Sequence, residues 1–214
     1  MFIDLTTLGL FALSAAALTL IPGADMLCAL SNAISQGTKA GLITVFGAVT
    51  GVTCHIGLAI AGVTALIASS PVLYGFFVVG GALYIMWVGF GIFNNKNAIS
   101  LQNNSERKSL HKLYSQGLLT NLLNPKAIIF TLAFIPQFIR VEAGMPGMQM
   151  LILGIELIVI MFLIEIPLVF LAGKIALKIK TSPAIGIYIN KFFGAVILAL
   201  AVAILATRVL QGLK

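Results

Sequence analysis

The chain has 214 residues, of which 60% are hydrophobic and 9% are charged, and its formal net charge is +7. A soluble domain carries about 25% charged residues, so this chain could not cover a globular surface with polar groups and is predicted to be a membrane protein. The positive charge does not indicate nucleic-acid binding, because the Lys and Arg residues flank long apolar segments and no soluble domain remains to carry a basic groove.

Apolar segments of spanning length predict an all-α polytopic membrane protein with six transmembrane helices. The first residues, Met1 to Asp4, lack the basic region of a secretory signal, so the first helix is expected to stay in the protein. The predicted helices cover residues 5–35, 40–68, 71–93, 113–138, 147–173 and 188–210, and the first and fourth are broken at Pro22 and Pro125.

A polar connector at residues 94–112 divides the chain into two three-helix repeats, residues 1–93 and 113–214. Nine Lys and Arg residues flank the helices on the side of this connector, three lie on the opposite side, and Lys126 falls within a helix. The positive-inside rule therefore predicts a cytoplasmic connector and places both termini outside. Because three is odd, the two repeats are expected to be inverted relative to one another, as in many secondary transporters.

Both broken helices carry a charged residue beside the proline, in the segments Pro22-Gly23-Ala24-Asp25 and Asn124-Pro125-Lys126. Unpaired backbone groups and formal charges are unfavourable in a bilayer, so the pattern indicates a polar cavity that a solute could occupy. Asp25 could accept a proton or bind a cationic group, or it could cap the helix that restarts after the break. The two roles are compatible with one another.

Lys126 lies 14 residues from the nearest basic residue on either side, so its side chain is too deep to reach a membrane surface. It requires an internal partner. Asp25, Glu156, Glu165 and a substrate carboxylate are the candidates, and the sequence leaves a structural ion pair and a direct substrate contact equally open.

Glu156 and Glu165 are nine residues apart on the fifth predicted helix, which places them on nearly opposite faces. One of them is expected to face the pathway. Pro167 deprives the Leu163 carbonyl of its helical partner and so favours Glu165 as the member of a polar cavity.

Four amide or imidazole side chains are further candidates. Asn32 shares a helical face with Asp25. His55 continues a stripe of glycines and could relay protons, although a hydrogen-bonded packing role is favoured. Asn121 and Asn124 lie on one face and could bind the ammonium or carboxylate of an amino acid while pairing with backbone groups freed by the proline.

Four blocks of residues form a family pattern: Pro22-Gly23 with Asp25; glycines 37, 41, 47 and 51; Gly81-Ala82-Leu83-Tyr84 with Gly89; and Asn121 with Asn124-Pro125-Lys126-Ala127 and the later Phe134, Pro136, Gln137 and Phe138. With these blocks the chain resembles the LysE/RhtB family of amino-acid exporters over essentially its whole length. Ala24 departs from the pattern, because the family usually has a second proline there, and a softer helix break is expected.

The resemblance implies a secondary transporter of the bacterial cytoplasmic membrane that exports amino acids or their derivatives, driven by proton antiport and without a cofactor or a metal. Its partners would be a small-molecule substrate, protons and the lipid bilayer, and the sequence is compatible with a homodimer. The candidate pathway residues are Pro22, Gly23, Asp25, Asn32, His55, Asn121, Asn124, Pro125, Lys126 and Glu165.

A thiol-disulfide electron conductor of similar inverted-repeat plan is the alternative function. Such a protein needs a cysteine pair that meets across the repeat, whereas Cys28 and Cys54 both lie in the first half. A membrane enzyme is disfavoured because the sequence shows no nucleophile–base pair and no metal-ligand spacing.

Overall fold

The computed structural model describes residues 3–94, 107–175 and 184–212, and within these ranges every regular element is helical. The elements are α1 (Leu5–Leu20), α2 (Ala24–Gln36), α3 (Thr38–Ser69), α4 (Pro71–Asn94), α5 (Leu110–Leu122), α6 (Pro125–Ile129), η1 (Phe130–Phe134), η2 (Ile135–Phe138), η3 (Val141–Ala143), α7 (Pro146–Phe170) and α9 (Ala184–Gly212). The all-helical class predicted from the sequence is confirmed. Most of the predicted connector, residues 95–106, lies outside the described residues.

Three of these helices are long and apolar enough to cross a membrane: Thr38–Ser69, Val72–Asn94 and Pro146–Phe170. Two further pairs pass the same test together, α1 with α2 and α5 with Pro125–Phe138, and they are bent by 55° and 56° respectively. The described residues therefore hold three to five candidate spans, and both predicted helix breaks are present. The sixth span remains a prediction, because α9 contributes only the shorter apolar stretch Asn190–Ala203 to this test.

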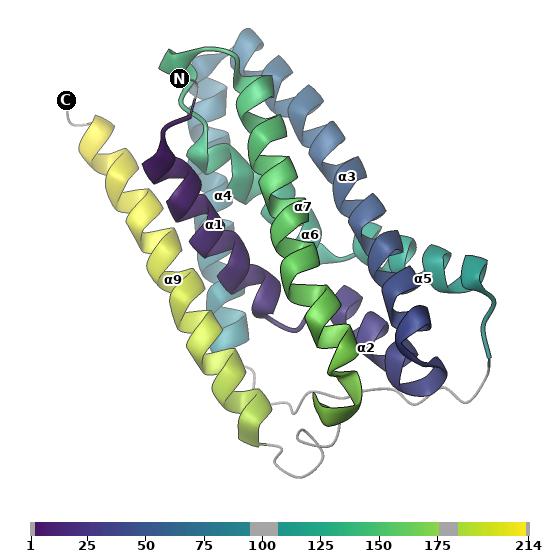
Figure 1. Ribbon diagram of the computed structural model, residues 1–214. Helices are drawn as coiled ribbons and strands as arrows, with labels where there is room; N and C mark the ends of the chain where they lie inside the picture. The colour runs from purple at the N-terminus through teal and green to yellow at the C-terminus, as the bar shows by residue number, and fades with distance from the viewer. Residues whose placement is uncertain (1–2, 95–106, 176–183, 213–214) are drawn as a thin grey trace.

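The helices form one elongated bundle in which α7 runs through the middle and α4 and α9 lie along one side (Figure 1). The helix α3 packs against α2, α5 and α7, whereas α1 packs against α7 and α9. The start of α1, the end of α9 and the turn from α3 to α4 lie at the same end of the bundle (Figure 1). The outward faces are apolar, with Phe76 and Trp87 of α4 74% and 68% exposed, as expected where lipid replaces water.

Glycines allow α3 and α5 to approach until their backbones touch. A Cβ atom at Gly47 would meet the backbone carbonyl of Tyr114, and one at Gly117 would meet the carbonyl of Thr44. Small residues at a helix interface permit such an approach. The first half of the chain therefore contacts the second backbone to backbone along this line.

Polar contacts fix the bundle end where α1 begins. Asp4 caps α1 by accepting a hydrogen bond from the Thr7 backbone N–H at 2.8 Å, and its other oxygen accepts one from Arg140 at 2.7 Å. The backbone hydrogen bond of Thr7 contributes most to holding the pKa of Asp4 below its usual value, and the Arg140 guanidinium adds to it. Gln149 holds the segment before α7 by pairing with the backbone of Arg140 and Gly144.

Candidate functional site

Both helix breaks have a local chemical cause. Pro22 lacks a backbone N–H and cannot continue α1, and the extended Gly23 precedes α2 as its N-cap. In the second half, Asn124 is the N-cap of α6, and its side-chain oxygen accepts a hydrogen bond from the Lys126 N–H at 3.0 Å. Pro125 then occupies the first helical position, where its fixed φ is favourable. The second break is thus a capped restart rather than a frayed end.

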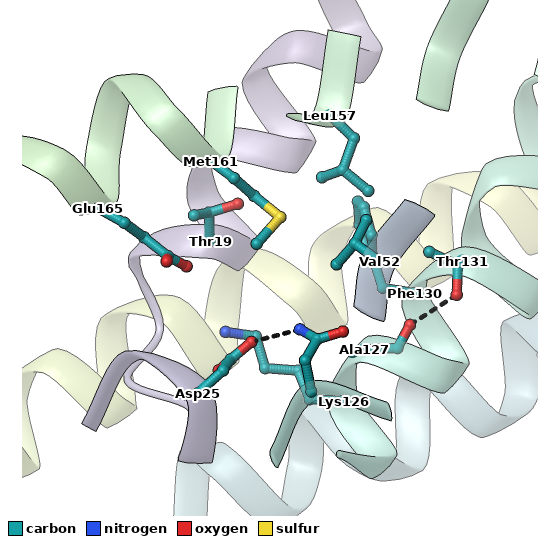
Figure 2. Close-up of a pocket in the computed structure, with 11 residues that line it drawn as sticks. Thr19, Asp25, Val52, Lys126, Ala127, Phe130, Thr131, Leu157, Met161 and Glu165 are labelled. Carbon is teal, nitrogen blue, oxygen red and sulfur yellow. Dashed lines mark hydrogen bonds between the residues drawn. The ribbon is translucent and has the colours of Figure 1, made fainter. Parts of the chain in front are cut away.

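The two breaks meet at one small cavity with a volume open to water-sized molecules of about 40 Å³. A cavity needs roughly 10–15 Å³ of such volume to hold a water molecule, so this space has room for about two or three waters. We call it the polar cavity, and its walls come from six helices and the π-helical segment η1: Thr19, Asp25, Val52, Asn121, Lys126, Ala127, Phe130, Thr131, Leu157, Met161 and Glu165. Figure 2 shows Asp25, Lys126 and Glu165 entering it from three different helices.

Asp25 joins the two halves of the chain. One carboxylate oxygen accepts a hydrogen bond from the Met26 backbone N–H at 3.0 Å, which satisfies one of the free donors at the start of α2. The other oxygen accepts a hydrogen bond from the Asn121 amide nitrogen at 2.9 Å (Figure 2). Asp25 is only 6% exposed. It is therefore both a helix-terminal residue and a wall of the polar cavity, as the sequence allowed.

Lys126 is held by a backbone carbonyl and not by a carboxylate. Its ammonium donates a hydrogen bond to the Ile21 carbonyl oxygen at 2.6 Å, across the break between α1 and α2. Lys126 interacts electrostatically with Asp25 and Glu165, yet the only ion pair within 4 Å in the described part of the chain joins Asp4 and Arg140. Of the candidate partners, Asp25, Glu156 and Glu165 make no ion pair with Lys126 within 4 Å, and a substrate carboxylate remains a prediction. The broken helix itself supplies an acceptor.

Glu165 reaches the polar cavity from α7 and is 4% exposed. Its Oε2 atom has no hydrogen-bond partner in the described ranges. Glu156, nine residues earlier on the same helix, does not line the cavity. The structure thus places Glu165, and not Glu156, at the cavity with Asp25 and Lys126. Glu165 is also the residue that the position of Pro167 favoured in the sequence.

The two asparagines each retain an unused polar atom. Asn121 is fully buried, and its side-chain oxygen has no hydrogen-bond partner among the described residues; the same holds for the amide nitrogen of Asn124. A buried polar group without a partner is unfavourable by about 1–3 kcal/mol, so the Asn121 oxygen at the polar cavity is suited to bind water or solute, whereas Asn124 does not line the cavity. His55 contacts the backbone of Asn121, with its Nε2 atom 3.5 Å from the Asn121 carbonyl oxygen. It does not line the cavity.

Asn32 belongs to a different polar cluster. Its amide nitrogen donates to the Thr44 hydroxyl at 2.9 Å and to the Gln116 side-chain oxygen at 3.4 Å, and its oxygen accepts from Lys108 at 3.3 Å. It lies about two helical turns from Asp25, which is too far along α2 to share the cavity. The structure therefore does not bring Asn32 to the other candidates.

Gly23 shapes the polar cavity although it has no side chain. A Cβ atom at this position would lie 2.7 Å from the Asp25 carboxylate and 3.3 Å from the Lys126 ammonium. The two charged side chains therefore occupy the space that any other residue at position 23 would need. Pro22 and Pro125 act differently, since they set the backbone breaks and do not line the cavity.

Several cavity residues were not predicted. Thr19 and Thr131 are polar residues in apolar helices within six residues of a predicted break, which is a signal that sequence analysis could have used. Phe130 and Met161 are indistinguishable in sequence from ordinary core residues. The described residues contain no group of three His, Cys, Asp or Glu side chains that could hold a metal ion, and Cys28 and Cys54 are free thiols.

Comparison with protein families identifies a match over most of the chain. Residues 16–208 match the family described as "LysE type translocator". The resemblance seen in the sequence is thereby confirmed over most of the chain.

Relatives of similar length include proteins named for efflux. The chain is 29% identical over 198 residues to a "Homoserine/homoserine lactone efflux protein" of Salmonella typhi, covering 92% of this chain and 95% of the relative. It is 30% identical over 195 residues to a "Leucine efflux protein" of Klebsiella pneumoniae, with 89% and 91% covered. It is also 32% identical over 185 residues to an uncharacterized membrane protein of Vibrio cholerae, with 86% and 89% covered. No solved structure matches the chain significantly.

Proposed function

We propose that this chain, which belongs to the family of LysE type translocators, exports amino acids or close derivatives across the bacterial cytoplasmic membrane in exchange for protons. Members of this family are transporters and not enzymes. Two of the relatives carry the names of efflux proteins for leucine and for homoserine or its lactone. Neither the family nor these names support the alternative of a thiol-disulfide conductor.

One observation carries the proposal: a carboxylate and an ammonium face the same cavity without contacting one another. A free amino acid at neutral pH carries an ammonium that can bind the carboxylate and a carboxylate that can bind the ammonium. Asp25 can bind the ammonium of such a solute, and Lys126 can bind its carboxylate once it leaves the Ile21 carbonyl. The unused side-chain oxygen of Asn121 can accept a further hydrogen bond from the solute. Charged groups deep in a membrane protein are typical of substrate and ion pathways.

Proton coupling is assigned to the carboxylates. Glu165 shares the cavity with Asp25, and its Oε2 atom has no hydrogen-bond partner among the described residues, so it can take up a proton without breaking a hydrogen bond at that atom. Protonation of either carboxylate would weaken its attraction for the substrate ammonium. Binding of a proton and binding of the amino acid would then exclude one another, which is the requirement for antiport.

The cavity is too small for an amino acid as it stands, since sites for small molecules usually measure about 300–1,000 Å³. Transport therefore requires the helices to separate on one side of the site at a time. We infer an inverted-repeat mechanism in which α1 to α4 and α5 to α9 form the two halves. The nearly equal bends of 55° and 56° support it. The packing supports it as well: the broken helix of each half packs on the second long helix of the other half, α1 on α7 and α5 on α3.

Both termini are proposed to lie outside the cytoplasmic membrane, in accordance with the distribution of Lys and Arg residues. Single cysteines can test this in a variant without Cys28 and Cys54. An impermeant thiol reagent added from outside should label the segment between Val141 and Gly147 and should not label Lys112→Cys in intact cells. The opposite pattern would overturn the proposed orientation.

Reconstituted vesicles test the transport function directly. The purified protein should accumulate a labelled neutral amino acid against its gradient when a pH gradient is imposed, and Asp25→Asn and Lys126→Met should each abolish this accumulation. If a variant with apolar residues at both positions transports at the wild-type rate, the two charges only support one another structurally and the site assignment is wrong.

A further inference from the structure

A second cavity lies directly beside the first and is almost entirely apolar. It has a volume open to water-sized molecules of about 30 Å³ and lies between α1, α4, the α6–η1 segment and α9. We call it the apolar chamber; Leu18, Ile85, Val88, Phe134 and Ile197 are among its walls. Among the described residues that line it, Lys126 is the only one with a polar side chain.

Lys126 and Phe130 line both the polar cavity and the apolar chamber. The two spaces therefore lie on two sides of the same helical turn, with the Lys126 side chain as a common wall. A ligand whose carboxylate binds the Lys126 ammonium would have its Cα near this wall. Its side chain would then be within reach of the apolar chamber, while its ammonium faces Asp25.

We propose that the apolar chamber binds the side chain of the exported amino acid and selects short, uncharged, apolar side chains. This inference rests on the proposed function, since it names the substrate class of the same site. The described lining of the chamber offers hydrocarbon contacts and, besides Lys126, no side-chain hydrogen-bond partner. A hydroxyl, amide or charged group placed there would lose its water without compensation. The small volume excludes an indole ring unless the walls move.

The expected selectivity follows from the apolar area that each substrate buries. Burial of one methylene corresponds to about a fourfold gain in affinity, so the efficiency of transport should rise from alanine through aminobutyrate to norvaline or leucine. Lysine and glutamate should be transported poorly. An aromatic amino acid should be rejected for its size.

Val88 offers a matched test, because it lines the chamber from α4 while Val78 on the same helix is fully buried outside it. The full-length protein would be assayed in vesicles for transport of labelled leucine, alanine and phenylalanine. Val88→Ala should shift the preference toward phenylalanine by about tenfold, and Val88→Phe should reduce leucine transport at least tenfold while alanine transport remains. Val78→Ala should leave the order of preference unchanged.

The outcomes separate the two proposals. If wild-type protein moves no amino acid, the proposed function fails and the side-chain site fails with it. If amino acids are moved but Val88→Ala leaves the ratio of leucine to phenylalanine unchanged, the proposed function stands and the chamber is a packing gap or a niche for a lipid chain. Val88→Ala carries this decision alone if Val88→Phe does not fold.

Discussion

Replacing Gly23 by alanine is expected to impair transport without unfolding the protein. The backbone of Gly23 has φ −100° and ψ 175°, an extended conformation that alanine adopts without strain. The added methyl group is therefore the whole perturbation. It would lie 2.7 Å from the Asp25 carboxylate oxygen and 3.3 Å from the Lys126 ammonium, and both groups are the mobile ends of side chains.

The magnitude follows from these distances. Ordinary van der Waals contact begins at about 3.4 Å, so the Asp25 carboxylate must move by about 0.7 Å. The contacted atom is Oδ1, which accepts the hydrogen bond from the Met26 backbone N–H at 3.0 Å, and a shift of that size along its axis stretches this bond to about 3.7 Å, where it no longer counts as a bond. A hydrogen bond to a charged group contributes about 1.5–3 kcal/mol, which corresponds to roughly a tenfold to hundredfold loss of transport efficiency.

The assay is uptake of labelled leucine into reconstituted vesicles, with the amount of folded protein measured by size-exclusion chromatography. Gly9→Ala on α1 is the matched control, because a Cβ atom there meets nothing within 4 Å. The control should transport like the wild type. If Gly23→Ala does so as well, then the position of the Asp25 carboxylate at the start of α2 is not needed for transport and the geometric reasoning is refuted.

Three further predictions concern the cavity acid, the helix contact and the helix cap. Glu165→Gln should transport with a strongly reduced dependence on the imposed pH gradient, whereas Glu156→Gln on the same helix should retain the wild-type dependence; equal behaviour of the two variants would remove Glu165 from proton coupling. Gly117→Ala should destabilise the protein by about 1–3 kcal/mol because its methyl group meets backbone of α3, and Gly57→Ala, which meets nothing within 4 Å, should not lower the melting temperature in detergent. Asn124→Ala should lower the free energy of unfolding by about 1 kcal/mol, because it removes the N-cap of α6. Asn124→Asp keeps the accepting oxygen and should retain most of that stability in the same melting experiment.

The helix breaks could be predicted because their causes are local. Pro22 and Pro125 interrupt helices wherever they occur in a helix interior, and both predicted breaks lie within a few residues of the observed helix ends. Helical periodicity and one proline favoured Glu165 over Glu156 as a member of a polar cavity, and Glu165 is the one that lines it. Local sequence therefore predicts which residues are available to a site.

The contacts within the site could not be derived in the same way. Asp25 and Asn121 are 96 residues apart, and no sequence pattern around either residue indicates that the two side chains are in contact. The partner of Lys126 was missed because it is a backbone carbonyl, which every residue has and no sequence pattern marks. Asn32 was misplaced because a shared helical face does not imply a shared depth in the membrane.

The three charges around the polar cavity also relate transport to voltage. With Asp25 and Glu165 ionised and Lys126 protonated, these side chains carry a formal charge of −1, which a bound zwitterion leaves unchanged and a bound proton cancels. If the chain exchanges one zwitterion for one proton, as proposed above, each cycle moves one positive charge inward. The membrane potential contributes about 2.3 kcal/mol per 100 mV to that step. A cell with an inside-negative potential could thus drive export even where the pH on the two sides is equal.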